Sequence, residues 1–149
     1  MKRFCFGAAA MLVVLASASC DEELSSITGP TPNLTPTLSS IQREIFNVTD
    51  SSGRLMCIGC HSDQGRVPAS NLVLLEGRSH GQLVSRASTG KAGATLVIPG
   101  DPDNSYLVKK LEGSIDIVGQ RMPRGNGPFL IEGQMTVIRK WIQDGAQNN

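Results

Sequence analysis

Two cysteines and a histidine stand within five residues of the chain, in Cys57-Ile58-Gly59-Cys60-His61. Two thiols separated by two residues can each add to one vinyl group of a haem, and a histidine directly after the second thiol is then held under the iron as an axial ligand. The motif therefore predicts one covalent haem (haem c), attached at Cys57 and Cys60 and ligated by His61. Such a chain folds around a large apolar disc tied to it at two points, and we expect the haem-free chain to fold poorly.

Two other uses of a CxxC pair compete with haem attachment. A redox disulfide of the thioredoxin type is disfavoured by the adjacent histidine and by the lack of a βαβ pattern. A zinc site needs a fourth ligand, from His80 or a carboxylate, and the chain has no second CxxC.

Residues 1–19 have the order of a secretory signal peptide. Lys2 and Arg3 form a positive start, an apolar run follows over 4–15, and small residues occupy 16–19. The apolar run is shorter than the ~18–20 residues that a membrane span needs. We therefore expect export to the periplasmic or cell-envelope side, with a short uncleaved anchor as the alternative.

Cys20 directly follows this signal. Cys5 leaves with the signal peptide, and the three remaining cysteines are an odd number, so one thiol lacks an intramolecular partner. Ser17-Ala18-Ser19-Cys20 resembles the lipobox of bacterial lipoproteins, except that this family usually has Leu at the position of Ser17. The resemblance implies lipidation of Cys20 and a membrane anchor, whereas ordinary signal cleavage would leave Cys20 as an exposed thiol.

Residues 20–38 are rich in Ser, Thr and Pro and have no helical or strand period. This composition predicts a disordered linker, long enough to hold a small domain away from a bilayer. The folded domain is then 39–149. Ser39 and Gln42 have the spacing of a capping box, and Ile41, Ile45 and Val48 repeat with a helical period, which predicts a first helix.

Two more helices are expected in the second half. A turn at 99–102 precedes Asp103 or Asn104, either of which can cap a helix that ends at Gly113. The clearest helix is the last one, which Gly145 can close; its apolar stripe consists of Ile131, Met135, Val137, Ile138, Trp141 and Ile142. The stretch 65–99 has too little pattern to assign its short apolar runs to strands or helices.

The sixth position on the iron has four candidate ligands, or it is vacant. Met122 stands on a loop, because Pro123 disfavours the helical conformation before it and glycines surround it. Met56 adjoins the motif and belongs to the His61 side of the ring, and Met135 belongs to the apolar stripe of the last helix. His80 has polar and glycine neighbours, which are typical of a solvated loop histidine. We predict Met122 as the sixth ligand.

At this point the chain resembles the small single-haem cytochrome c domains of bacterial exported proteins. The resemblance is carried, in order, by the CxxCH motif, Pro99-Gly100-Asp101-Pro102 with Ser105 and Leu107, Arg121-Met122-Pro123, and Gln134 with Trp141-Ile142 and Gly145-Ala146. It implies a mostly helical (mostly α) fold wrapped around the haem, Cys57 and Cys60 as attachment points, His61 and Met122 as axial ligands, and electron transfer as the activity. The chain departs from the family at Ile131, where a Ser or Thr cap is usual.

Two functional classes follow from the ligand set. With both axial positions filled, the protein is an electron carrier and not an enzyme, whose partner is an unidentified redox protein. With an open or displaceable sixth position, it is a haem enzyme or gas sensor; an electron-entry subunit of a larger exported complex is a third reading. The near balance of 14 basic and 13 acidic residues argues against nucleic acid as a partner. Arg66, Arg121 and Arg124 are candidates to pair with haem propionates, or are solvated charges.

Overall fold

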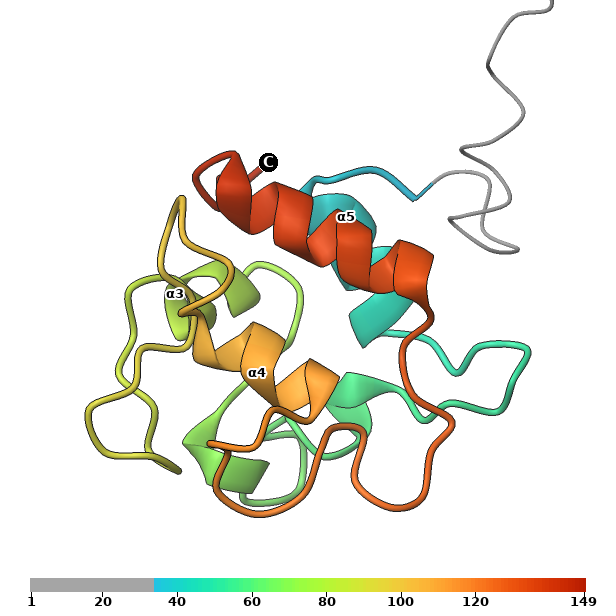
Figure 1. The fold of residues 1–149 in the computed structure, drawn as a ribbon. Helices are drawn as coiled ribbons and strands as arrows, with labels where there is room; N and C mark the ends of the chain where they lie inside the picture. The colour runs from blue at the N-terminus through green and yellow to red at the C-terminus, as the bar shows by residue number, and fades with distance from the viewer. Residues whose placement is uncertain (1–33) are drawn as a thin grey trace, which may run out of the picture.

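The computed structural model describes residues 34–149 and consists of short helices joined by long connections (Figure 1). The helices are α2 Leu38–Ile41, η1 Gln42–Phe46, η2 Cys57–Gly59, η3 Ala69–Asn71, α3 Ser79–Leu83, α4 Tyr106–Glu112 and α5 Glu132–Gln143. Over residues 34–149 the extended segments form only isolated bridges, and none of them is part of a longer strand. The predicted mostly helical class is therefore confirmed.

The predicted signal peptide, Cys20 and the linker up to residue 33 lie outside the described residues. Across residues 34–149, no helix has the length and apolar character of a membrane span. The packed part of the chain begins before the expected boundary at Ser39, because Leu34 and Leu38 are buried in the core.

The first helix runs from α2 directly into η1, whose backbone has π-helical hydrogen bonds. It begins at Leu38, because the Thr37 hydroxyl accepts a hydrogen bond from the backbone N–H of Ser40 (3.2 Å). The expected cap at Ser39 is therefore wrong. Ile41 and Ile45 are fully buried as predicted, whereas Val48 lies beyond the end of the helix.

Helix α5 carries the predicted apolar stripe, and its members from Met135 to Ile142 are buried. Ile131 is the exception: it precedes the helix and is 39% exposed, so its assignment to the stripe is wrong. An isoleucine side chain cannot accept a hydrogen bond. The side chain of Gln134 instead accepts one from the backbone N–H of Ile131 (3.3 Å), which satisfies one of the free donors at this end of the helix.

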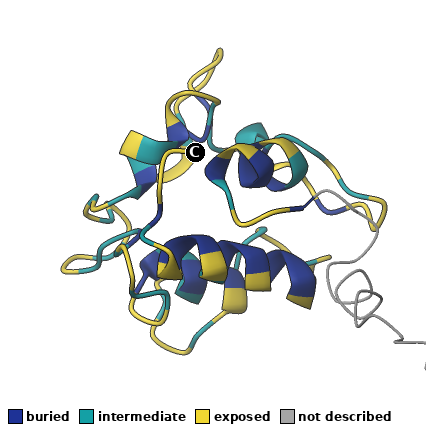
Figure 2. Ribbon diagram, turned by 90° about the horizontal axis from the view of Figure 1, so that it is seen from above, coloured by how far each residue is buried: buried dark blue, intermediate teal, exposed yellow. Residues whose placement is uncertain are grey.

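The core lies where α5 meets the first helix on one side and α4 on the other (Figure 1). Buried and exposed positions share the longer helices in Figure 2, so α4 and α5 each turn one side inward. The last residue of the chain, beyond α5, is bound to the first helix. The backbone N–H groups of Leu38 and Ser39 donate to the side-chain and backbone oxygens of Asn149 (2.9 and 2.8 Å).

Helix α4 begins after Ser105, and the expected caps at Asp103 and Asn104 are wrong. The Ser105 hydroxyl donates to the carbonyl of Asp101 (2.7 Å) and accepts from the N–H of Ile98 (2.9 Å), so it closes the turn before the helix. The helix ends at Gly113 as predicted, with a φ of +76° that favours glycine. The unassigned stretch 65–99 contains η3, α3 and the bridge between Val84 and Val97.

Candidate haem-binding site

Cys57, Cys60 and His61 lie on a single tight turn. Cys57 opens η2, and its carbonyl oxygen accepts hydrogen bonds from the N–H groups of Cys60 (3.2 Å) and His61 (2.9 Å). Both thiols are free; Cys57 is half-buried and packs against the hydrophobic core, whereas Cys60 is exposed. The turn therefore presents two thiols and an imidazole from one short piece of backbone.

The imidazole of His61 has a fixed tautomer. Its Nδ1 lies 3.1 Å from the carbonyl oxygen of Ala69, and because a carbonyl can only accept, Nδ1 carries the proton. Burial lowers the pKa of His61, although the backbone hydrogen bonds with Ala69 and Leu72 oppose this. The lowered pKa favours the neutral ring, and the proton on Nδ1 leaves the Nε2 lone pair for a metal, which is the form that binds iron.

The loop after the motif folds back onto it. The N–H of Ala69 donates to the carbonyl of Cys60 (3.0 Å), and the N–H of Leu74 donates to the carbonyl of His61 (2.8 Å). These bonds hold the Ala69 carbonyl in reach of the imidazole. Residues of the stretch 65–99, whose sequence showed no clear pattern, therefore hold the His61 ring in position.

The surroundings of the Cys57 thiol disfavour redox exchange. Burial raises the pKa of Cys57, and the charge of Arg54 only partly opposes the rise. A reactive CxxC pair needs a lowered pKa, so the raised pKa of Cys57 argues against the thioredoxin-like alternative. Within residues 34–149 no three His, Cys, Asp or Glu side chains converge as a zinc site requires.

Met122 lies on the connection between α4 and α5, as predicted. It is half-buried and packs against the same core cluster as Cys57 and Ile58. Its backbone N–H donates to the carbonyl of Lys110 (2.9 Å), which ties it to α4. The structure thus brings Met122 and the turn of the CxxCH motif to one core, with a thioether supplied from a loop. We call this turn, over residues 57–61, the attachment turn after its predicted role.

Lysines hold the loop that leads to Met122. The ammonium groups of Lys91 and Lys109 each lie 3.0 Å from one carboxylate oxygen of Asp116, and Lys110 donates to the carbonyl of Val118 (3.0 Å). Hydrogen bonds from Lys91 and Lys109 lower the pKa of Asp116 because they stabilise the ionised carboxylate. We call Asp116 with Lys91 and Lys109 the loop clamp.

Three arginines are candidates to pair with haem propionates, and one of them, Arg121, makes its contacts within the protein. Its Nε donates to the carbonyl of Leu111 (2.7 Å), and its guanidinium stacks 4.0 Å from the centre of the Phe129 ring. It is therefore not a solvated charge. Arg66 is exposed and donates to the carbonyl of Gly59, and Arg124 is exposed.

The three other candidates for the sixth iron ligand are His80, Met135 and Met56, and each has different surroundings in the structure. His80 lies on α3, is half-buried, and its Nε2 lies 3.0 Å from the carbonyl oxygen of Ala146, so the expectation of a solvated loop histidine is wrong. Met135 is buried in the core, as predicted. Met56 is 40% exposed and directly precedes η2.

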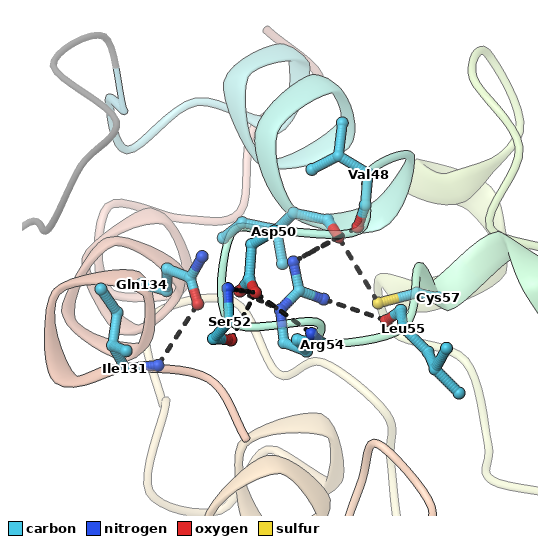
Figure 3. A network of polar contacts seen from close by, with 9 residues as sticks. Val48, Asp50, Ser52, Arg54, Leu55, Cys57, Ile131 and Gln134 are labelled. Atoms are coloured by element: carbon cyan, nitrogen blue, oxygen red, sulfur yellow. Dashed lines mark hydrogen bonds and ion pairs between the residues drawn. The ribbon is translucent and has the colours of Figure 1, made fainter. Parts of the chain in front are cut away.

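Sequence reasoning missed Arg54 and Asp50, which lie just before the motif. The Arg54 side chain is fully buried and forms an ion pair with Asp50 (Nε to Oδ2, 2.9 Å; Figure 3). Burial alone raises the pKa of Asp50, but hydrogen bonds from Ser52 and Arg54 lower it below its usual value. The spacing of four residues between Asp50 and Arg54 was a signal for the pair, but nothing in it indicates burial.

Comparison of the chain with protein-family models, with curated proteins and with solved structures finds no match. The site is therefore judged on its own residues. Two free thiols, a neutral imidazole with an available Nε2 and a half-buried thioether form a donor set that fits a covalently attached haem.

The loop clamp predicts the effect of Asp116→Asn. Loss of the carboxylate removes both ion pairs, so the loop opens more often and the amide N–H of Met122 exchanges with deuterium several-fold faster in hydrogen-exchange mass spectrometry. Asp103→Asn is the matched control, because Asp103 also forms an exposed ion pair, with Arg139, but far along the chain from Met122. Equal exchange of Met122 in the wild type and Asp116→Asn would show that the clamp does not hold the loop.

Proposed function

We propose that the protein is a one-electron carrier, a small exported c-type cytochrome with a cytochrome c-like helical fold around one haem. Cys57 and Cys60 would attach the haem, and His61 and Met122 would ligate its iron from opposite faces. When bound, the haem supplies an iron centre that cycles between two oxidation states. The chain's own residues hold the centre, fix its ligands and exclude water.

The observation that carries this proposal is the state of His61. In the CxxCH turn, the hydrogen bond from Nδ1 to Ala69 leaves the Nε2 lone pair for a metal, and burial favours the neutral ring by lowering its pKa. A metal-bound histidine needs both features, because the second nitrogen must be oriented by a partner and the ligating nitrogen must be unprotonated. A histidine in a structural turn would need neither.

Met122 supports a carrier over an enzyme or gas sensor. The backbone N–H of Met122 is tied to Lys110 of α4, and the exposed loop clamp adds weaker support, so Met122 stays close to the core. A histidine–methionine pair raises the reduction potential and leaves no open position for a substrate. His80, the other candidate, is already bonded to the carbonyl of Ala146.

The location of the protein follows from the predicted leader. We propose that the signal peptide directs export, that Cys20 is lipidated, and that the linker holds the domain on the periplasmic or cell-envelope side of a membrane. The redox partner would then be a protein near the same membrane. The near-neutral charge of the chain does not favour a highly charged partner.

Covalent attachment is tested by replacing both thiols, as Cys57→Ser with Cys60→Ser. We expect the double variant to lose all of its haem on denaturation, because no thioether bond remains, whereas the wild type keeps it. The measurement is the haem absorption of the polypeptide after extraction with acidified organic solvent. Cys20→Ser, which removes a thiol outside the motif, is the control and should keep its haem on denaturation as the wild type does. Haem that stays on the double variant would end the proposal.

The sixth ligand is tested by Met122→Ala. Removing the thioether should abolish the weak far-red sulfur-to-iron band of the oxidised protein, lower its reduction potential and open the iron to carbon monoxide or cyanide. The change in folding should be modest, because the haem remains tethered at Cys57 and Cys60.

Two variants serve as controls for Met122→Ala. Met135→Ala should cost about 2–5 kcal/mol of stability as a core truncation and leave the band intact. His80→Ala should lose about 1 kcal/mol with its hydrogen bond to Ala146 and leave the spectrum unchanged. The reverse pattern, with His80→Ala exposing the iron and Met122→Ala unchanged, would show a centre with two histidine ligands.

Anchoring is tested by Cys20→Ala. We expect this change to move the mature protein from the membrane fraction to the soluble fraction, because the acylated residue is lost. Fractionation followed by immunoblotting measures the shift, and the mass of the wild-type N-terminal peptide reports the lipid. A wild-type protein that is already soluble and carries no lipid would contradict the lipoprotein assignment.

A further inference from the structure

Arg54 is a buried cation next to the attachment turn. Its side chain is 0% exposed, whereas that of Arg43 in the first helix is 63% exposed. Its guanidinium donates to the carbonyls of Ile45 (3.2 Å) and Leu55 (3.3 Å) and to the carboxylate of Asp50 (2.9 Å; Figure 3). Carbonyl oxygens solvate the charge, but the only charged partner among these acceptors is Asp50.

Arg54 and Cys57 share an acceptor. The carbonyl oxygen of Ile45 accepts a hydrogen bond from Nη2 of Arg54 and also one from Sγ of Cys57, at 3.8 Å. Burial raises the pKa of the Cys57 thiol, and the positive charge of Arg54 opposes the rise. The field of the guanidinium therefore reaches the sulfur that the proposed function joins to the haem.

Resting on that proposed function, we propose that Arg54 is a tuning residue that raises the reduction potential of the haem attached at Cys57, and that Asp50 limits the rise. Reduction adds one electron, delivered by the redox partner, and no bond forms or breaks. A fixed positive charge favours the state that carries the extra electron, and this effect is strong where water and salt do not screen it. Arg54 meets this condition because its side chain has no solvent exposure.

Because Arg54 and Asp50 carry opposite charges, neutralising each of them should shift the reduction potential in opposite directions. Gln in place of Arg54 removes the positive charge, so the potential should fall. Asn in place of Asp50 removes the negative charge and leaves the guanidinium with its carbonyl acceptors, so the potential should rise. A merely structural role would not give opposite shifts, because either change would loosen the same segment in the same way.

The experiment is a spectroelectrochemical titration of the purified haem-loaded protein and four variants. We expect the reduction potential of Arg54→Gln to lie below that of the wild type and the potential of Asp50→Asn to lie above it. Arg54→Lys keeps the charge, so its potential should be the closest to the wild type among the site variants. Arg43→Gln is the matched control, since it removes an equal but exposed charge, and should leave the potential unchanged. The oxidised spectrum and the peptide mass with two thioethers confirm that ligands and attachment are intact in each variant.

Three results would overturn the inference: equal potentials for Arg54→Gln and Arg43→Gln, shifts of the same sign in Arg54→Gln and Asp50→Asn, or a fall in Arg54→Lys as large as in Arg54→Gln. If Arg54→Gln does not accumulate, Asp50→Asn decides, and a potential at or below the wild type refutes the inference. A wild-type chain without covalent haem would instead refute the proposed function, so the two failures are distinguishable.

Discussion

The hydrogen bond from His61 Nδ1 to the carbonyl of Ala69 is the interaction on which the candidate site depends. It fixes the tautomer of the ring and leaves Nε2 as the only nitrogen able to bind iron. The bond exists because the chain after the motif turns back, with Ala69 and Leu74 donating to the carbonyls of Cys60 and His61. Without this return loop the imidazole would be free to rotate, and the turn would present two thiols and an unoriented ring.

The site is held from two sides by different physical means. Before the motif, the buried Arg54 donates hydrogen bonds to backbone carbonyls and pairs with Asp50, and its side chain is shielded from water. On the Met122 side, the loop is held by exposed pairs between Asp116 and two lysines, which salt and solvent weaken. The attachment turn is thus expected to be the rigid half of the site, and the Met122 loop the half that opens first.

The sequence predicted the parts of the fold that rest on periodicity. The stripe of α5 from Met135 to Ile142 and the buried Ile41 and Ile45 follow from spacing, and the stop at Gly113 follows from the left-handed conformation that glycine adopts easily. The helix starts did not, because a cap depends on which hydroxyl reaches a free N–H, as Thr37 does. The support of His61 and the burial of Arg54 depend on contacts between residues that carry no periodic pattern, and the role of His80 depends on Ala146, far away in the sequence.

The most direct test of the proposed function is the absorption spectrum of the wild-type protein matured with haem, recorded oxidised and reduced. Covalent haem with His61 and Met122 as ligands predicts haem bands that remain with the denatured polypeptide, and, in the native oxidised state, a weak far-red sulfur-to-iron band that disappears on reduction. A polypeptide without haem absorption would contradict haem attachment. A haem protein that lacks the far-red band and binds carbon monoxide rapidly would contradict the carrier and indicate an open iron site.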